Sequence, residues 1–213
     1  MRIPALTLAA AASAYWLALR PWYLRWGATD VDVARQWPGD ELIVAPWMRA
    51  IRAVTVHAPA ENVWPWIMQV DRERGGFYSY TWLENLIGAD IHNVEQLIPG
   101  LPDRQAGDTV WMGPRDKFHG MARMVVAKVD PHRAMVLVLP TDAERLRHGG
   151  APETVWSFIL EPASEHTTRF VMLSLAAKPR IADLLFWEPA HFVMERRMML
   201  TIKRLAEQLA ASV

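Results

Sequence analysis

Apolar and polar residues alternate in six segments of the chain, and this pattern predicts β-strands. One segment lies near residue 50; the other five follow Gly107 and are separated by turn residues such as Pro131, Pro140 and Pro162. The hairpin-like spacing of these five predicts an antiparallel meander. The six predicted strands cover residues 49–57, 109–112, 121–129, 134–139, 154–160 and 167–175.

Elsewhere apolar residues recur every three or four positions, which predicts helices. Pro189 is expected to interrupt or kink the longest of them. A further short helix through Gln36 is expected to be capped by Thr29 or Asp30. The polar stretch 141–152 is expected to form a loop. The other helices are predicted at residues 60–70, 80–87 and 181–211.

This order of elements predicts an α+β fold, with one curved antiparallel sheet wrapped on a long C-terminal helix. Such an architecture often encloses a ligand pocket. Strands 134–139 and 154–160 are apolar on both faces, whereas a sheet with one wet face alternates more cleanly. We therefore expect the outer face to be partly covered by the N-terminal segment, a second subunit or a membrane.

Residues 3–19 contain no charged side chain, and aromatic residues and two arginines, Arg20 and Arg25, follow them. A helix of this length would span about 25 Å, somewhat short of the hydrocarbon core of a bilayer. One interpretation is a membrane anchor in residues 1–24, with residues 25–213 as a cytoplasmic ligand-binding domain. The alternatives are a signal peptide cleaved near Ser13, with export of the protein, and an apolar helix docked on a soluble cytoplasmic protein.

Composition excludes several classes of function. Lys plus Arg and Asp plus Glu both number 23, so the basic excess of a nucleic-acid-binding protein is absent. The chain has no cysteine, which excludes disulfides, thiolate catalysis and cysteine-ligated metals. Eleven tryptophans and eleven methionines suit a ligand cavity, a membrane face or a large core.

Several strings resemble the START/Bet v 1-like superfamily, also called SRPBCC or helix-grip, and within it the bacterial polyketide cyclase/dehydrase-like branch. The strings span most of the chain outside the N-terminal run. They are RWGAT at 25–29, PGD at 38–40, APAENVWPW at 58–66, GFYSYTWLEN at 76–85, and FVMERRM at 192–198 with IKR at 202–204. The resemblance implies a helix-grip fold with an apolar cavity, and it leaves the chemistry open because superfamily members include carriers, cyclases and parts of larger enzymes.

We therefore expect the protein to bind or transfer a hydrophobic small molecule, such as a lipid, isoprenoid or polyketide-like compound, at a membrane and without cofactor or metal. The loop from Tyr78 to Trp82 and the short helices would form the gate. The residues expected to contact the ligand are large and apolar or aromatic: Trp66, Tyr78, Tyr80, Trp82, Trp111, Met124, Trp156, Phe158, Met172, Met194 and Met198.

Two other classes of function stay open. A cyclase or aromatase acting on a polyketide-like substrate would need an acid or base near the substrate. An accessory subunit would dock its sheet face on a membrane protein, and a homo-oligomer would bury the same face. No catalytic residue is assigned, and the acid/base candidates for the enzyme are Tyr78, Tyr80, Glu84, His119 and His191.

Other polar residues have a functional and a structural interpretation. Glu188, His191 and Glu195 share one helix face, but a carboxylate-bridged metal pair needs a second copy of the motif. Asp116, His119 and Arg123 are either an acid/base group at the cavity mouth or an ordinary polar hairpin. Arg169 is expected to point outward into solvent, since an inward charge would need a carboxylate partner.

Overall fold

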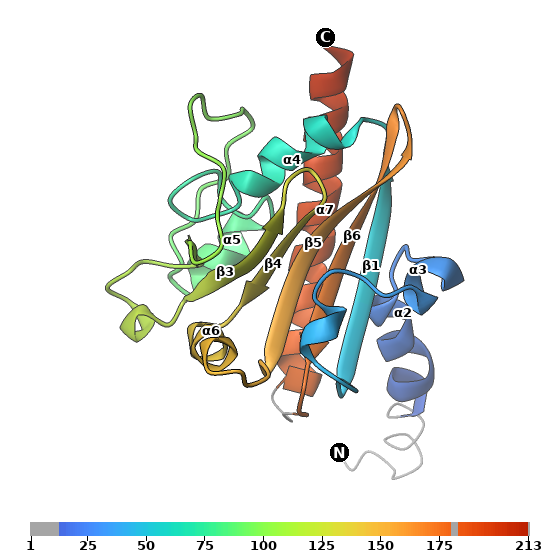
Figure 1. Cartoon of the computed structure of the whole chain (residues 1–213), viewed down its shortest axis with the longest axis vertical. Coiled ribbons are helices and arrows are strands. Elements are labelled where there is room, and N and C mark those ends of the chain that lie inside the picture. Colours follow the sequence, from blue (N-terminus) through green and yellow to red (C-terminus); the bar gives the residue numbers. More distant parts are fainter. Residues whose placement is uncertain (1–12, 180–182, 213) are drawn as a thin grey trace, which may run out of the picture.

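The computed structural model describes residues 13–179 and 183–212 (Figure 1). The strands are β1 (Met48–Val56), β2 (Thr109–Trp111), β3 (Arg123–Asp130), β4 (Ala134–Val138), β5 (Thr154–Ser164) and β6 (Thr167–Ala176). The α-helices are α2 (Arg20–Leu24), α3 (Asp30–Ala34), α4 (Ala60–Met68), α5 (Thr81–Leu86), α6 (Pro140–Arg147) and α7 (Glu188–Ala211). Short π-helical or 3-10 segments are η1 (Tyr15–Leu19), η2 (Asp40–Leu42), η3 (Phe118–Gly120) and η4 (Asp183–Trp187).

The six strands form one antiparallel sheet in the order β1-β6-β5-β4-β3-β2. The five-strand meander is confirmed, and β1 joins it beside β6, with Met48 opposite Ala176. The sheet curves around α7, which runs behind it in Figure 1. These described residues have the α+β helix-grip architecture expected from the sequence.

Alternation within each strand divides the core into two layers. On β6, Phe170 and Met172 point to the concave face and belong to the cluster under α4 and α7. Val171 and Leu173 point to the convex face and belong to a second cluster with Trp37. The apolar residues on both faces of the strands are therefore explained by two separate cores.

The convex face is covered by the chain itself. Trp37 and Ile43, from the segment between α2 and β1, are buried against it, and the segment crosses in front of the sheet in Figure 1. The capping box at α3 holds this segment in place: the Thr29 hydroxyl accepts from the Asp32 N–H, and the Asp32 carboxylate accepts from the Thr29 N–H. The outer face is covered, as expected, but residues 28–46 supply much of the cover in place of the three expected sources, the N-terminal segment, a second subunit or a membrane.

Three sequence-based expectations need correction. The expected loop 141–152 contains helix α6, which has Pro140 in its first turn and is tied to the sheet because the Asp142 carboxylate accepts from the Thr154 N–H. Helix α6 is mostly polar, so it shows no apolar periodicity in the sequence. The helix predicted over residues 181–211 is divided into η4 and α7, and Pro189 lies within the first turn of α7.

Arg169 is the third correction. It lies on the convex face, as expected, but it is not solvated: its guanidinium donates to the Asp32 carboxylate at 2.6 Å and to the Gly27 carbonyl at 2.6 Å. Burial alone would raise the pKa of Asp32, but the bonds from Arg169 and Thr29 hold it below its usual value. An ion pair thus fastens residues 27–32 to β6.

The predicted N-terminal anchor falls mostly outside the described residues, which begin at Ser13. Its described end, residues 13–24, is helical, and Tyr23 and Leu24 pack against Ala50 and Phe192. Within residues 13–179 and 183–212, no helix is long and apolar enough to cross a bilayer.

Candidate functional site

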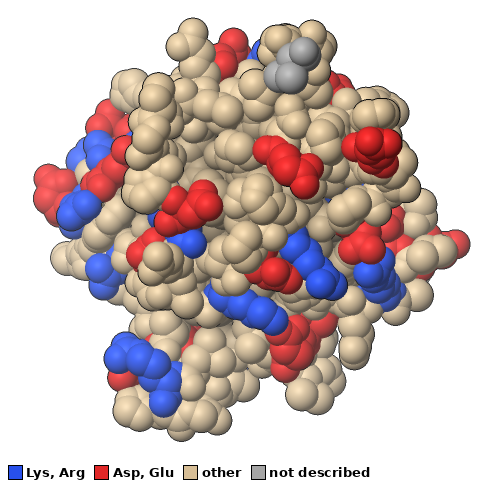
Figure 2. Space-filling view, turned by 45° about the horizontal axis from the view of Figure 1, so that its top comes forward, with Lys and Arg blue, Asp and Glu red and all other residues tan. Residues whose placement is uncertain are grey.

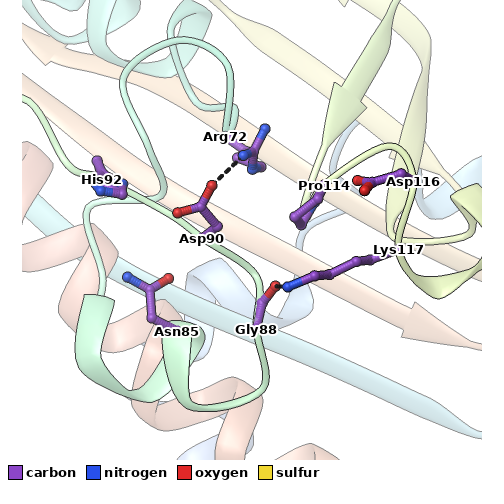
Figure 3. Close-up of a pocket in the computed structure, with 8 residues that line it drawn as sticks. All are labelled: Arg72, Asn85, Gly88, Asp90, His92, Pro114, Asp116 and Lys117. Atoms are coloured by element: carbon purple, nitrogen blue, oxygen red, sulfur yellow. Dashed lines mark hydrogen bonds and ion pairs between the residues drawn. The ribbon is translucent and has the colours of Figure 1, made fainter.

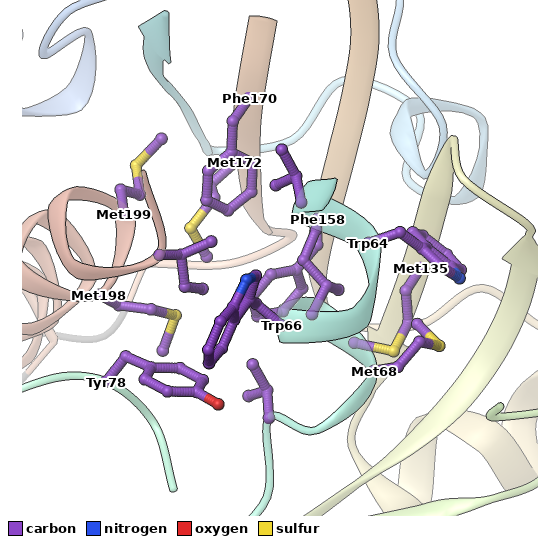
Figure 4. Packing of buried hydrophobic residues seen from close by; sticks show 14 of the residues in the cluster. Trp64, Trp66, Met68, Tyr78, Met135, Phe158, Phe170, Met172, Met198 and Met199 are labelled. Carbon is purple, nitrogen blue, oxygen red and sulfur yellow. The ribbon is translucent and has the colours of Figure 1, made fainter. Parts of the chain in front are cut away.

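The space between the concave face of the sheet, α4 and α7 is filled by large apolar side chains (Figure 4). Exposed fractions of the buried members of this group range from 0 to 9 %, so the side chains pack against one another rather than around an open pocket. Seven of the residues expected to contact a ligand belong to it: Trp66, Tyr78, Met124, Trp156, Phe158, Met172 and Met198.

The other four expected residues lie elsewhere. Trp82 is 67 % exposed on α5. Trp111 is half-buried between the guanidinium groups of Arg115 and Arg123. Tyr80 and Met194 are half-buried and do not belong to the cluster: Arg197 stacks over the Tyr80 ring, and Met194 belongs to α7.

Two of the five buried residues that α7 contributes to this interior are methionines, and further methionines enter it from α4 and from the sheet. Its unbranched, polarizable side chain adapts to differently shaped neighbours. A closed interior of this composition can rearrange around a ligand at a smaller cost than one built from branched residues. The methionines of the cluster are Met68, Met124, Met135, Met172, Met198 and Met199.

The indole N–H of Trp66 is buried in this interior without a hydrogen-bond partner among the described residues. In Figure 4 the Trp66 ring stands between Met198, Tyr78 and Phe158. An unpaired buried donor costs about 1–3 kcal/mol, so its presence calls for an explanation such as a bound acceptor. By contrast, the Trp156 indole N–H donates to Glu195 Oε1 at 2.8 Å.

The segment predicted as the gate is fastened by side-chain hydrogen bonds. Gly76 has a φ of 79°, and a Cβ at this position would clash with Asn93. The Asn93 amide oxygen accepts from the N–H groups of Phe77 and Tyr78, and the Ser79 hydroxyl donates to the Met194 carbonyl at 2.9 Å. These bonds hold the loop to Asn93, in the irregular chain that follows α5, and to α7.

Tyr78 is unsuited to act as a base at neutral pH. Its side chain is 1 % exposed, and its hydroxyl accepts from the Gln69 amide at 2.5 Å. Burial raises the pKa of Tyr78 to about 12, against the smaller lowering effect of Gln69. The phenol therefore keeps its proton at neutral pH, accepts from Gln69 and has its O–H left to donate.

Glu84 is the one carboxyl group among the five acid/base candidates, and it is buried. It is 2 % exposed on α5, and its Oε2 atom has no hydrogen-bond partner among the described residues. Burial raises the pKa of Glu84 to about 7. A carboxyl group with this pKa exchanges a proton near neutral pH, as general acids and bases do.

A buried ion pair joins β1 to the first half of α7. Arg52 on β1 and Glu195 on α7 are each at most 2 % exposed and are hydrogen-bonded to one another. The Arg52 Nε–H also donates to the Tyr23 carbonyl, and the Ser174 hydroxyl lies 3.4 Å from Glu195 Oε1. Sequence analysis missed this pair, although Arg52 is a charged residue on a strand face otherwise formed by Ala50, Val54 and Val56.

His191 lies beside this pair, with its ring 5.5 Å from that of Trp156. Burial lowers the pKa of His191, and the positive charge of Arg52 adds to this effect against the opposing Glu195. Burial alone would raise the pKa of Glu195, but Arg52, His191 and the Trp156 N–H together hold it below its usual value. The site therefore combines a histidine of lowered pKa with a carboxylate–guanidinium pair.

The shared helix face of Glu188, His191 and Glu195 does not form a metal site. Glu188 accepts from Arg20 and from the Tyr23 hydroxyl, while Glu195 binds Arg52. Over the residues that the structure describes, no group of three or more acidic or histidine side chains is arranged to hold a metal ion.

A separate polar cleft of about 610 Å³ opens between the chain around residues 85–92 and the loop 114–117 (Figure 3). Arg72 pairs with Asp90 on one side, and the Lys117 ammonium lies 3.5 Å from the Gly88 carbonyl on the other. The residues that line it are Arg72, Asn85, Gly88, Asp90, His92, Pro114, Asp116 and Lys117.

The expected cluster of Asp116, His119 and Arg123 is not assembled in this cleft. Asp116 lines it, but His119 is exposed with a φ of 53° and Arg123 stacks over Trp111. The face shown in Figure 2 carries mixed acidic and basic side chains, in keeping with the zero net charge.

Comparison with known proteins gives structural matches only: no family model and no curated protein matches the chain. The self-sacrificing resistance protein CalC from Micromonospora echinospora is 12 % identical with a TM-score of 0.43, over 78 % of this chain and 97 % of CalC. The Aha1 dimer from Colwellia psychrerythraea is 13 % identical with a TM-score of 0.44, over 75 % of this chain and 96 % of Aha1.

DynU16, a protein of the dynemicin biosynthetic locus, is 12 % identical with a TM-score of 0.41, over 73 % of this chain and 47 % of DynU16. Identities this low say nothing about a ligand, so the chemistry of the site rests on the residues described above.

Proposed function

We propose that the chain binds a hydrophobic small molecule, of a lipid, isoprenoid or polyketide-like kind, between the concave face of the sheet and α7. The single observation that supports this function is the buried Trp66 indole N–H without an acceptor, surrounded by methionine and aromatic side chains. An apolar ligand with a carbonyl, ether or hydroxyl oxygen would satisfy this donor while its hydrocarbon part displaces adaptable methionines.

The proposed ligand enters past the segment from Tyr78 to Trp82. Its described contacts with α7 are one hydrogen bond, from the Ser79 hydroxyl to the Met194 carbonyl, the Arg197 guanidinium over the Tyr80 ring, and Tyr78 beside Met198 in the cluster, without the hydrogen-bond ladder of a strand. Such a segment can open locally at a lower cost than the sheet. The proposal also includes attachment to a membrane through the N-terminal segment, the source or destination of the ligand.

The test is mass spectrometry of organic extracts from the full-length protein after gentle purification. We expect a stoichiometric apolar compound with at least one oxygen acceptor. Trp66→Phe keeps an aromatic ring but removes the N–H together with the five-membered part of the indole, and the lost hydrogen bond alone should lower retention of the compound roughly fivefold. Trp37→Phe is the matched control, because Trp37 is buried on the convex side and its N–H already donates to the Asp32 carbonyl.

An empty extract that persists after detergent exchange, together with no thermal stabilisation by added lipids or isoprenoids, would refute ligand binding. Equal loss of the compound in Trp66→Phe and Trp37→Phe would refute the specific role of the Trp66 N–H. A protein partner that copurifies in place of a small molecule would favour an accessory subunit.

A second candidate function, a cyclase-type enzyme, is favoured by one observation: the buried Glu84 carboxyl with a pKa of about 7. Enolisation of a polyketide-like ketone needs a group that accepts and returns a proton near neutral pH. In such an enzyme Glu84→Gln should abolish turnover of the extracted compound while its binding persists. Unchanged turnover in Glu84→Gln would exclude Glu84 as the base.

A further inference from the structure

The helical residues 13–24 present apolar side chains to solvent over most of their circumference. Trp16, Leu17, Leu19 and Trp22 are between 46 and 80 % exposed, whereas the buried side of the segment is formed by Tyr23 and Leu24. A short helix that exposes aromatic and aliphatic groups on several sides is unusual for a surface bathed only in water.

A second element, distant in the sequence, adds to this exposed surface. Phe186 and Trp187 in η4 are 70 and 56 % exposed. The two elements are joined: the Tyr15 hydroxyl donates to the Leu184 carbonyl at 2.6 Å, and Arg20 forms a salt bridge with Glu188 at 2.9 Å. Trp22 also meets Phe192 edge-on at 5.3 Å. Residues 13–24 and η4 therefore form one fixed surface, which we call the aromatic face.

Two arginines follow on α7, and the first, Arg196, is linked to this face through Trp26, whose ring meets that of Phe192 at 6.3 Å. Arg196 and Arg197 are exposed and stack over the rings of Trp26 and Tyr80 at 4.9 and 5.6 Å. In the part of the chain that the structure describes, neither arginine has an ion pair with a carboxylate. By contrast, Arg20 is neutralised by Glu188. The border of the aromatic face therefore carries uncompensated positive charge.

We propose that the aromatic face, with Arg196 and Arg197 at its border, docks on the surface of an anionic lipid bilayer. Tryptophan and phenylalanine favour the interface between head groups and acyl chains, and arginines beside them attract anionic lipids. The sequence before Ser13 has one charged residue, Arg2, in twelve, so the chain that leaves this face is also suited to a bilayer. A second copy of the chain is disfavoured because two-fold pairing would bring like-charged arginines toward each other.

This inference goes beyond ligand binding and beyond an N-terminal anchor, because it assigns membrane contact to η4 and α7 of the folded domain. It also fixes the orientation of the domain. The start of α7 would face the bilayer, and the convex face of the sheet, covered by residues 28–46, would face water.

The experiment is flotation of the full-length protein with vesicles of phosphatidylcholine, alone or mixed with phosphatidylglycerol. We expect binding that is stronger on the mixed vesicles. Phe186→Ser combined with Trp187→Ser should weaken binding about tenfold on both kinds of vesicle, because two half-exposed aromatic groups no longer enter the interface. Arg196→Gln combined with Arg197→Gln should weaken binding roughly tenfold on the mixed vesicles only.

Val31→Ser combined with Val44→Ser is the matched control, since both valines are at least 75 % exposed but belong to the segment over the convex face. This variant should bind vesicles as the wild type does. Thermal unfolding checks that each variant is folded, which is expected because every substituted residue is exposed.

The proposal would be overturned by wild-type protein that does not float with either vesicle, or by a Phe186/Trp187 variant that binds as tightly as the control. A dimer in analytical ultracentrifugation that dissociates in the Phe186/Trp187 variant would assign the face to a second copy instead. Retention of the extracted ligand is measured in the same variants. Because docking can fail while ligand binding persists, this second measurement distinguishes failure of the docking proposal from failure of the proposed function.

Discussion

The buried Glu84 makes the stability of the protein depend on pH. Its carboxyl has a pKa of about 7 in the folded protein, compared with an ordinary value of 4.5, because burial disfavours the charged form. The folded state therefore binds more protons than the unfolded state between these two values. The contribution of Glu84 to stability is complete below pH 4.5 and is lost as the pH rises toward 7.

We therefore predict that Glu84→Gln flattens the pH dependence of stability. In the wild type, ionisation of Glu84 should cost about 3 kcal/mol between acidic pH and pH 8, since one pKa unit corresponds to about 1.4 kcal/mol. Urea unfolding of both proteins at several pH values measures the difference. Glu165→Gln is the control, because Glu165 is exposed. Parallel profiles for wild type and Glu84→Gln would show that Glu84 is ionised in the folded protein.

The residues that sequence analysis could not place share a physical reason. The strand positions of Arg52 and Arg169 follow from local alternation, but their partners do not. Glu195 lies 143 residues from Arg52, and Asp32 lies 137 residues from Arg169. A buried charge needs a partner, so the sequence indicates that one exists, and only the packed structure identifies it.

At the scale of elements, strands were easier to predict than helices. In a strand of this sheet, every second side chain points to the same face, and this repeat is visible in the sequence. The observed strand boundaries mostly lie within two residues of the predicted ones. The exception is β5, which continues to Ser164 past an irregularity at Pro162. Helix α6 was missed because its sequence, PTDAERLR, has Ala143 and Leu146 as its only apolar contacts to the convex core.

The short helix α3 helps to hold residues 28–46 against the convex face of the sheet. We predict that Thr29→Ala costs about 1 kcal/mol of unfolding free energy through loss of the N-cap bond. Asp32→Ala should cost about 2–3 kcal/mol, because it removes the second half of the capping box and leaves Arg169 without its carboxylate.

Chemical denaturation measures both values. Thr29→Ser keeps a hydroxyl for the Asp32 N–H and should be within a few tenths of a kcal/mol of wild type. If Asp32→Ala cost no more than Thr29→Ala, the ion pair with Arg169 would contribute nothing measurable to the attachment of residues 27–32.

For the whole molecule, the curved sheet and the long helix were predicted from the order of elements. The closed interior was not predicted, because side-chain alternation says which residues point inward and not how completely they fill the space. The same limit applies to the ligand: the sequence indicated the interior surface, and the unpaired Trp66 N–H became visible only once its neighbours were in place.

The boundary expected between residues 24 and 25 is testable at this scale. Tyr23 and Leu24 are buried against Ala50 and Phe192, and the Tyr23 carbonyl accepts from the buried Arg52. Starting the chain at Arg25 would therefore open a cavity over β1 and α7 and leave the Arg52 Nε–H without an acceptor. We predict a loss of stability on the order of 5 kcal/mol, the sum of two large buried side chains and one buried hydrogen bond.

The reference for this measurement is a chain that starts at Ser13, which keeps every contact described above. Urea unfolding of the two shortened proteins should give midpoints well apart, and Tyr23→Phe in the Ser13 form should fall between them because it removes only the hydroxyl bonded to Glu188. Equal midpoints for the two shortened proteins would mean that residues 25–213 are independent of residues 13–24. Separate midpoints would make the helical residues 13–24 part of the folded domain, and the aromatic face would then be rigidly coupled to the interior through Arg52 and Glu195.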